Sequence, residues 1–503
     1  MRTSFVPSRR LRKPQSQTHW VLGVAALTAL AVAAPHVSRA ADPAPSPAIS
    51  DHDRIKQLEE TVERLKKDTR QVEVSVENQN AKPLAGWSLK DGFTLQAPDG
   101  ANKLRIGGYT QADGRFFIDD KNDVLNNQFL FRRARLDISG TVFKYFDFRI
   151  LPDFVLASNG SFQLFDAFVD VNYIPEAKLR VGKFKPPVGL ERLESATSLQ
   201  FVERGQPTNL VPNRDQGVQL FGDLIGGAFS YQLAIVNGVP DNVNPTTVND
   251  ANDDKDFAGR VFAAPFKDSS IDPLKGLGFG VAGTYGRQRG SATSGASELP
   301  SFKSFGQATY FSYSGAVAPT STASGKTQSF AFGQRQRIVP QLDYYWGPVG
   351  LLAEYARSAQ AVRRDTLNSS NKVTSTASET LANDAWLVGA SYVITGEAAS
   401  YRGVVPAQPF DPFAGTWGAF EVAARYGQLE VDPDAFSKGY ASPTSSARRD
   451  KEWVIGVNWY LNRSIKFVLD YGHSDYSGGA GSGKNVADRP SENAILSRVQ
   501  LVL

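Results

Sequence analysis

The feature that most constrains the fold is a strict alternation of apolar and polar residues, repeated in segments from about residue 103 to the C-terminus. Residues 133–139 read RARLDIS, residues 453–461 read WVIGVNWYL, and the chain ends on RVQLVL at 498–503. Side chains of a β-strand point to opposite faces in turn, so a period of two with one apolar face is the pattern of antiparallel sheet. The alternation therefore predicts an all-β architecture over most of the 503-residue chain.

The connections between these segments alternate in length. Short turns are expected at 222–227, 346–348 and 462–464, and long polar loops at 237–255, 359–383 and 474–493. Short turns on one rim and long loops on the other are typical of an outer-membrane barrel, whereas a soluble β-sandwich has shorter strands. The 55 aromatic residues (31 Phe, 17 Tyr, 7 Trp) suit two interfacial girdles. An apolar outer face and a polar lumen explain a mean hydropathy of −0.30 in a membrane protein.

The strand count leads to the same architecture. We expect strands near 104–117, 128–142, 145–154, 162–173, 178–185, 216–223, 228–236, 256–266, 277–287, 303–313, 327–345, 349–358, 384–394, 417–429, 451–461, 465–473 and 494–503. Bacterial outer-membrane barrels have an even number of strands, so one of these seventeen segments is expected to be loop, and we assign 303–313 to that role. The predicted fold is a transmembrane antiparallel β-barrel of about 16 strands in residues 104–503.

The first 40 residues differ in character from the rest. They carry six Lys or Arg and no acidic residue, and contain an uncharged apolar run at 20–34 followed by Ser38-Arg39-Ala40. This order predicts a secretory signal peptide cleaved after Ala40, because the 15-residue run is shorter than the roughly 20 residues of a spanning helix. Loss of the six cations changes the formal charge from +4 to −2. No nucleic-acid partner is therefore expected.

A helix is expected between the leader and the barrel. Residues 41–50 are rich in Pro, Ala and Ser and predict a flexible spacer. In 51–80, apolar residues recur three and four apart from Ile55 to Val76, which predicts a short coiled-coil helix. A single amphipathic helix packed on its own domain is the alternative reading. Residues 81–103 are expected to be a linker.

The phase of the alternation indicates which charges face the lumen. The inward set is Arg105, Asp113, Arg115, Arg133, Arg135, Asp166, Arg260, Glu354 and Arg425. Arg132 falls on the opposite phase, so it is expected at a rim or a β-bulge.

One long connection is a candidate constriction. The segment from Lys183 to about residue 215 contains five cations, namely Lys183, Lys185, Arg192, Arg204 and Arg214. A loop of this length in a compact domain usually has a function, and folded into the lumen it would narrow the pore. Arg and Lys there would favour anions, and Arg matches phosphate oxygens as a bidentate fork. The alternative is that these cations pair with Glu191, Glu194 and Glu203 of the same loop.

The residues offer little for catalysis or metal binding. The chain has no Cys, which excludes thiolate nucleophiles and Cys-ligated metals. His473, Ser474 and Asp475 are adjacent in sequence, whereas members of a catalytic triad converge from separate elements. The Asp/Asn cluster at 250–256 lacks the spacing of a calcium loop. We expect no catalytic residue, no metal site and no cofactor.

Several longer strings carry a resemblance to a known family. They are FLFRRARLDISG (129–140), LRVGKFKPPVGLE (179–191), FVERGQP (201–207), RIVPQLDYYWGPVGLLAEY (337–355), ASYVITGE (390–397), GTWGAFEVAARYGQLE (415–430), GVNWYLN (456–462) and SRVQLVL (497–503). In this order they resemble the phosphate-selective porins O and P of Gram-negative outer membranes. The resemblance implies a trimer of sixteen-stranded barrels, each with its own pore for phosphate or related anions.

The family's functional positions carry over only in part. The resemblance implies roles for the pair Arg132 and Arg133, for Asp166, and for Arg105 and Arg192, which stand where the family has Lys. In three other places the chain departs from the pattern, because Tyr109 replaces an Arg, residues 293–305 lack the family's Arg-rich loop, and the last residue is Leu503 rather than an aromatic one.

The combined prediction is an outer-membrane porin that passes small anions, phosphate foremost. The predicted anion-binding residues are Arg105, Arg115, Arg132, Arg133, Arg135, Asp166, Lys183, Lys185, Arg192 and Arg425. Expected partners are inorganic phosphate or other small anions, the lipid bilayer and lipopolysaccharide of the outer membrane, and two further copies of the chain. The alternatives are a general diffusion porin for small hydrophilic solutes and a structural role in which the 55–76 helix tethers or spaces the outer membrane.

Overall fold

The computed structural model describes most of the chain. The described residues are 51–80, 85–88, 92–118, 125–155, 162–245, 252–292, 296–315, 326–368, 370 and 372–503. The predicted signal peptide and spacer lie outside them. The chain divides into two units, Met1–Ser75 and Val76–Leu503, each described by itself below.

The first unit contains most of one long helix, α1 (Asp51–Asn80). Its described apolar side chains Ile55, Leu58, Val62 and Leu65 are all exposed, and they lie along the predicted heptad stripe. Coiled-coil pairing of this stripe stays a prediction. None of the helices in the described ranges is long and apolar enough to span a membrane.

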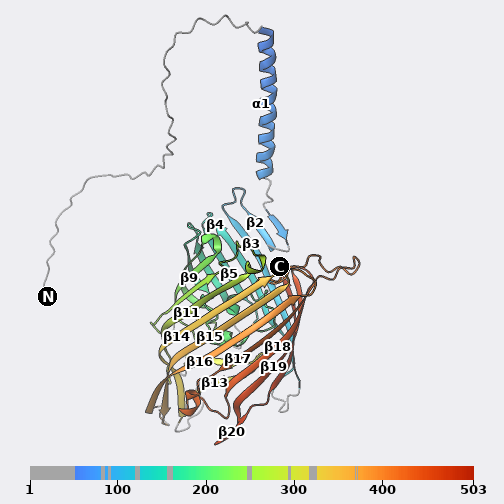
Figure 1. The fold of residues 1–503 in the computed structure, drawn as a ribbon. Coiled ribbons are helices and arrows are strands. Elements are labelled where there is room, and N and C mark those ends of the chain that lie inside the picture. Colours follow the sequence, from blue (N-terminus) through green and yellow to red (C-terminus); the bar gives the residue numbers. More distant parts are fainter. Residues whose placement is uncertain are drawn as a thin grey trace, which may run out of the picture. The chain divides into compact units, whose positions relative to one another are not determined.

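The second unit is a closed barrel of sixteen antiparallel strands (Figure 1). The strands are β3 (Lys103–Ile118), β4 (Gln128–Val142), β5 (Phe146–Asp153), β6 (Gln163–Val171), β7 (Lys178–Phe184), β8 (Asp215–Leu224), β9 (Phe229–Val236), β10 (Asp256–Ala263), β11 (Leu277–Arg289), β14 (Lys326–Trp346), β15 (Val349–Leu367), β16 (Val373–Val393), β17 (Ala419–Glu430), β18 (Ala447–Tyr460), β19 (Ile465–Ser482) and β21 (Glu492–Val502). Each pairs with the next, and β21 pairs with β3, which closes the barrel. The all-β prediction with an even strand number is confirmed.

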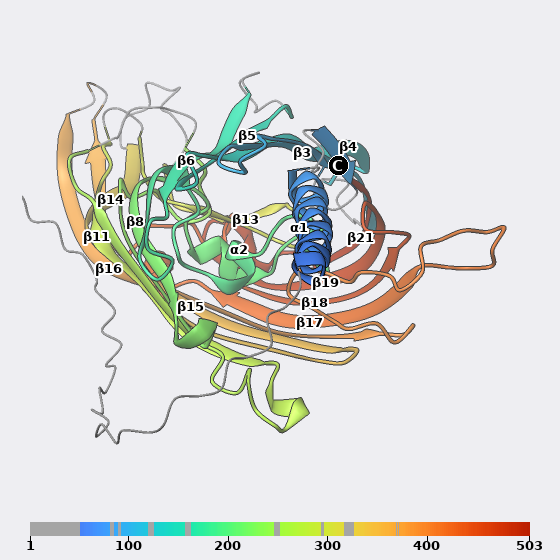
Figure 2. The same cartoon turned by 90° about the horizontal axis from the view of Figure 1, so that it is seen from above.

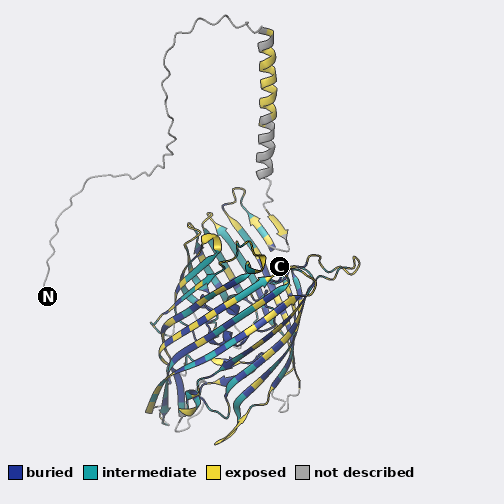
Figure 3. Ribbon diagram, viewed as in Figure 1, coloured by how far each residue is buried: buried dark blue, intermediate teal, exposed yellow. Residues whose placement is uncertain are grey.

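Alternation along each strand separates lipid from lumen. On β18 the side chains of Trp453, Ile455 and Val457 are exposed, whereas Val454 and Asn458 on the opposite face are fully buried. Figure 3 shows this as exposed and buried positions in turn along the strands. The barrel's outer surface is therefore the apolar one, and the polar face points inward.

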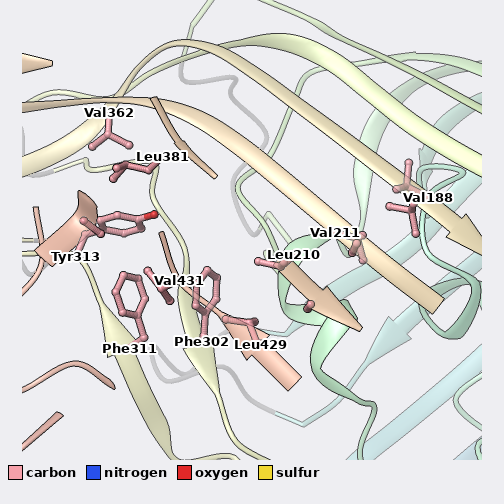
Figure 4. Close-up of a cluster of buried hydrophobic side chains, with 14 of the residues drawn as sticks. Val188, Leu210, Val211, Phe302, Phe311, Tyr313, Val362, Leu381, Leu429 and Val431 are labelled. Atoms are coloured by element: carbon pink, nitrogen blue, oxygen red, sulfur yellow. The ribbon is translucent and has the colours of Figure 1, made fainter. Parts of the chain in front are cut away.

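The segment assigned to loop, 303–313, is indeed no barrel strand. It belongs to a hairpin of two short strands, β12 (Ser301–Lys303) and β13 (Thr309–Ser312), which forms a separate sheet. Phe302 and Phe311 of this hairpin are buried in one cluster with inward-facing Leu381 and Leu429 of the wall (Figure 4). The connection between β11 and β14 thus folds into the barrel.

Two segments predicted as loops are strands instead. β15 and β16 remain paired out to Leu367 and Val373, where a long loop was expected at 359–383. Likewise β19 runs to Ser482 and pairs with β20 (Asn485–Asp488) inside the expected loop 474–493. About 9–11 residues of strand cross a bilayer, so the outer parts of these strands stand clear of lipid. There neither face must be apolar, and the backbone ladder continues without the alternation that reveals it in the sequence.

The smaller elements precede β3 or lie in the connections between barrel strands. They are β1 (Ala85–Ser88), β2 (Gly92–Gln96), α2 (Leu190–Leu193), η1 (Gln206–Leu210), η2 (Ile225–Gly227), η3 (Asp272–Leu274) and α3 (Asp434–Ser437). α2 and η1 belong to the long connection between β7 and β8, which we call the infolded loop (residues 185–214). Its Leu210 and Val211 are fully buried in the same cluster as the β12–β13 hairpin (Figure 4).

Candidate anion channel

The infolded loop is held inside the barrel by carboxylates of the opposite wall. The backbone N–H groups of Leu190 and Glu191 donate to Glu354 of β15 at 3.1 and 2.9 Å. Farther along the loop, the N–H of Val202 donates to Asp470 of β19 at 2.6 Å. Hydrogen bonds to charged groups are stronger than neutral ones, so these carboxylates fix the loop against the wall.

The loop's own acids pair with arginines of the barrel wall. Glu191 contacts Arg425 at 3.1 Å. Glu203 contacts Arg132 at 2.6 Å and Arg115 at 3.1 Å. The alternative reading, in which the loop's cations pair with glutamates of the same loop, is therefore not the arrangement found for Glu191 and Glu203.

Three cations of the loop are left without a carboxylate partner among the described residues. Lys185 donates to the backbone oxygen of Glu194 at 2.8 Å, and Arg204 to that of Glu191 at 2.8 Å. Arg192 donates to the side-chain oxygen of Asn242 at 2.6 Å. The hydrogen-bond acceptors that orient these three cations are therefore neutral groups.

A cavity of ≈ 650 Å³ lies between the infolded loop and strands β3–β9. Two acidic residues, Asp166 and Glu203, face ten basic ones in its lining. The basic residues are Arg132, Arg133, Arg135, Arg149, Arg180, Lys185, Arg192, Arg204, Arg214 and Lys303. Such a lining produces a positive potential within the cavity.

Six of the ten predicted residues line this cavity. They are Arg132, Arg133, Arg135, Asp166, Lys185 and Arg192. The other four lie outside its lining. Arg115 is bound to Glu203, Lys183 donates to the backbone oxygen of Pro245 at 2.6 Å, Arg425 lies between Glu191 and Glu452, and Arg105 is half-buried near the start of β3.

Arg132 occupies a β-bulge, as its phase in the sequence suggested. The register of β3 with β4 shifts here, because Gln111 faces Arg133 while Ala112 faces Phe131. Arg132 is the extra residue of β4, so two consecutive guanidinium groups reach the lumen.

Arg133 is the most nearly isolated charge of the predicted pair. It is only 4% exposed and donates to the side-chain oxygen of Gln111 at 2.6 Å. Gln111 is itself oriented by Gln500 at 2.6 Å and by the backbone oxygen of Ala196 at 2.9 Å. No carboxylate in the described part of the chain lies within 4.0 Å of Arg133, so its charge stays available to an ion.

Asp166 and Phe165 hold several of the arginines in place. Asp166 accepts from Arg214 at 3.1 Å and from Arg149 at 3.3 Å. Arg135 lies over the Phe165 ring, 3.6 Å from its centroid. A planar guanidinium that is stacked and hydrogen-bonded keeps one orientation, which suits repeated binding of an oxyanion.

The buried carboxyl of Glu203 stays ionised although it lines the cavity. Burial alone would raise its pKa, but the neighbouring Arg132, Arg133 and Arg115 and the hydrogen bond from Arg132 hold the pKa well below its usual range. Glu203 therefore offsets part of the charge of Arg132 and Arg115 throughout the physiological pH range.

Five lining cations were absent from the predicted set. Arg204 and Arg214 were noted only as cations of the long connection, and the other three were missed for different reasons. Arg149 and Arg180 lie between outward-facing apolar neighbours, such as Leu179 and Val181, so strand phase alone could have found them. Lys303 reaches the cavity only because the β12–β13 hairpin folds inward, and no local pattern signals that.

Comparison with known proteins identifies the family of this chain. Residues 104–503 match the family described as phosphate-selective porin O and P. The chain belongs to this family. Porin O of Pseudomonas aeruginosa is 25% identical over 415 residues, which cover 76% of this chain and 85% of that protein. The porin is thus a protein of the Gram-negative outer membrane and not an enzyme.

Solved structures of other porins resemble it at low identity. The channel DcaP of Acinetobacter baumannii is 11% identical with a TM-score of 0.48, and covers 81% of this chain and 99% of its own. A trimer form of OmpT of Vibrio cholerae is 11% identical (TM-score 0.47; 80% and 100% covered), and an anion-selective porin of Comamonas acidovorans is 9% identical (0.43; 80% and 100%).

Proposed function

We propose that this porin admits small anions, with phosphate as the leading substrate. The observation that carries the proposal is a set of five cations around the cavity, each without a carboxylate within 4.0 Å in the described residues. They are Arg133, Lys185, Arg192, Arg204 and Lys303. The family description, which names phosphate selectivity, supports the same substrate.

The arrangement gives a physical route to selectivity. An entering anion exchanges part of its hydration shell for fixed N–H donors, and cations are repelled by the same field. Guanidinium forks match the oxygens of phosphate better than they match a spherical halide. Several partly equivalent donors along the cavity let the ion bind without being trapped at one site.

A second candidate is a general diffusion porin, and specific contacts favour it. Many lining arginines are neutralised, as Arg135 is by Asp153 at 2.7 Å and Arg180 by Asp170 at 2.7 Å. The hydroxyl of Tyr109, which stands where the family has an Arg, accepts from Arg135 at 2.7 Å. A more neutral pore would pass uncharged solutes at rates close to those of anions.

Ion selectivity in planar bilayers separates the two candidates. We expect the reversal potential in a salt gradient to indicate preference for the anion, and phosphate to block chloride current. Arg133→Ala should weaken that block, with Arg289→Ala as the control because Arg289 is exposed on β11 outside the cavity. A cation-selective reversal potential would refute the anion proposal, and fast liposome swelling in neutral sugars would favour the diffusion porin.

Three further features belong to the same proposal. Residues 1–40 would be removed after Ala40 on export, and the barrel would lie among lipids and lipopolysaccharide. Three copies would assemble into a trimer, as the family resemblance implies. The exposed stripe of α1 would then pair with its counterparts as a coiled coil, or would contact another part of the envelope as a spacer.

A further inference from the structure

A rigid hairpin projects from the outside of the barrel between β16 and β17. In this hairpin, residues 409–417, Asp411 and Thr416 exchange backbone hydrogen bonds of 3.0 Å. The Asp411 carboxylate accepts from the backbone N–H of Phe413 at 2.9 Å, which fixes the turn. Phe413 at its tip is 100% exposed. Figures 1 and 2 show this segment in orange, pointing away from the wall in both views.

The base of the hairpin rests on the outer face of the wall. The Phe410 ring packs on Trp459 of β18, with ring centroids 5.2 Å apart. The indole N–H of Trp459 donates to the backbone oxygen of Trp417 at 2.7 Å. The two Pro residues in PFDPF (409–413) further restrict the backbone. Phe413 is therefore presented at a fixed place with little conformational entropy left to lose on binding.

An apolar groove of ≈ 690 Å³ lies on the same outer face. Its floor follows the strand register, where Ala112 and Gly114 of β3 lie opposite Val499 and Ser497 of β21. A Cβ atom on Gly114 would lie 2.8 Å from the Ser497 hydroxyl oxygen, so the floor has no room for a larger side chain at this position.

Aromatic side chains form the two sides of this groove. Phe129 and Phe131 of β4, which are 82% and 65% exposed, rise on one side. Phe467 and Trp459 rise on the other, toward the base of the hairpin. The hollow is therefore bordered on both sides by aromatic rings that stand out from the apolar outer wall.

We propose that Phe413 of one protomer inserts into the outer-face groove of the next protomer. The hairpin leaves the surface at the β17–β18 end, while Phe129 and Phe131 stand at the β4 end of the same face. A contact between two different ends of one surface is heterologous, and such a contact closes into a ring when the rotation fits. The aromatic tip and the apolar hollow match in chemistry, and the occupant is a second copy of this chain. The inference rests on the trimer proposed above.

Cross-linking of introduced cysteines tests the contact without competing thiols, because the chain has no Cys. Full-length porin carrying Phe413→Cys and Phe131→Cys is treated with oxidant or a short bis-maleimide. We expect a covalent ladder up to trimer in denaturing gels, since each protomer joins the next. The matched control combines Phe413→Cys with Ile338→Cys, an exposed outer position on β14, and should give no ladder.

The outcomes separate this contact from the trimer itself. If glutaraldehyde still traps trimers while the Phe413–Phe131 pair does not cross-link, the hairpin contact is refuted and the trimer stands. If the porin is monomeric by both reagents, both proposals fail.

A spin label tests the competing occupant, which is lipid. A nitroxide on Phe413→Cys should be immobile and shielded from both dissolved oxygen and an aqueous nickel chelate. Strong relaxation by oxygen would place the tip in the bilayer and would overturn the proposal. Phe413→Ser should lower the temperature at which trimers dissociate and leave the conductance of each pore unchanged.

Discussion

Two halves of the barrel wall differ in the inward charges that they present. Strands β4–β9 border the open cavity, and the charged residues that they contribute to its lining are five arginines and one aspartate. The half from β15 to β21 is covered by the infolded loop and the β12–β13 hairpin, and it is rich in buried carboxylates. These are Glu354, Asp365, Glu421, Asp450, Glu452, Asp470 and Glu492.

This difference explains how a nearly neutral chain can line its cavity with positive charge. Carboxylates of the covered half accept backbone N–H groups, as Glu354 does from Leu190 and Glu492 does from Gly306 at 3.0 Å. Such bonds use negative charge to hold loops without neutralising the cations that line the cavity. Anion preference then depends on where the charges lie, and the formal charge of −2 that the proposed removal of residues 1–40 would leave does not oppose it.

The largest effect is expected when the infolded loop loses its anchor on the covered half of the wall. Glu354→Ala leaves the backbone N–H groups of Leu190 and Glu191 without their acceptor. Each unsatisfied buried donor costs about 1–3 kcal/mol, and each 1.4 kcal/mol lowers the docked population of the loop roughly tenfold. Single-channel recording should show larger, noisier conductance with weaker anion preference. Glu379→Ala is the control, because this half-buried carboxylate of β16 pairs with Lys438 and does not anchor the infolded loop. Unchanged traces for Glu354→Ala would show that the loop does not need this anchor.

A smaller effect is expected when one negative charge is removed from the cavity lining. Glu203→Gln removes the charge that offsets Arg132 and Arg115 and keeps the size of the side chain. We expect tighter phosphate block, by about 1 kcal/mol or roughly fivefold in affinity. The exposed Asp272→Asn, which removes one negative charge on η3, should leave the block as in the parent porin. Weaker block by Glu203→Gln would mean that Glu203 is needed to hold the arginines in place.

The smallest effect is expected from a change of pH that titrates Glu194 of the infolded loop. Burial, with the nearby charge of Glu191, raises the pKa of the Glu194 carboxyl to about 8. A raised pKa means that the folded chain favours the protonated form, so stability falls as pH rises from the ordinary Glu range to about 8. Anion preference should decline from pH 7 to 9 as the carboxylate forms beside Lys185. Glu194→Gln should reduce this decline and leave the part that arises from Arg192, whose pKa is lowered by burial to about 9. An identical pH profile in that variant would exclude Glu194 as a source.

Sequence patterns predicted the strands whose outer face must contact lipid. Alternation located the membrane-crossing strands, and its failure beyond Ser358 and His473, although the strands continue to Leu367 and Ser482, marks where lipid stops constraining the outer face. Strand phase also found Arg133 and Arg135, which line the cavity. It could not foresee that Glu203 reaches Arg115, or that Lys303 enters the cavity, because both depend on long-range folding of loops.

The β-bulge at Arg132 sets how densely charge is spaced along the pore. Same-face residues of a regular strand are about 6.6 Å apart, whereas consecutive residues are about 3.3 Å apart. Because Arg132 and Arg133 both reach the lumen, β4 presents two guanidinium groups within the rise of a single residue. One inserted residue has thus doubled the linear charge density of this strand beside the cavity.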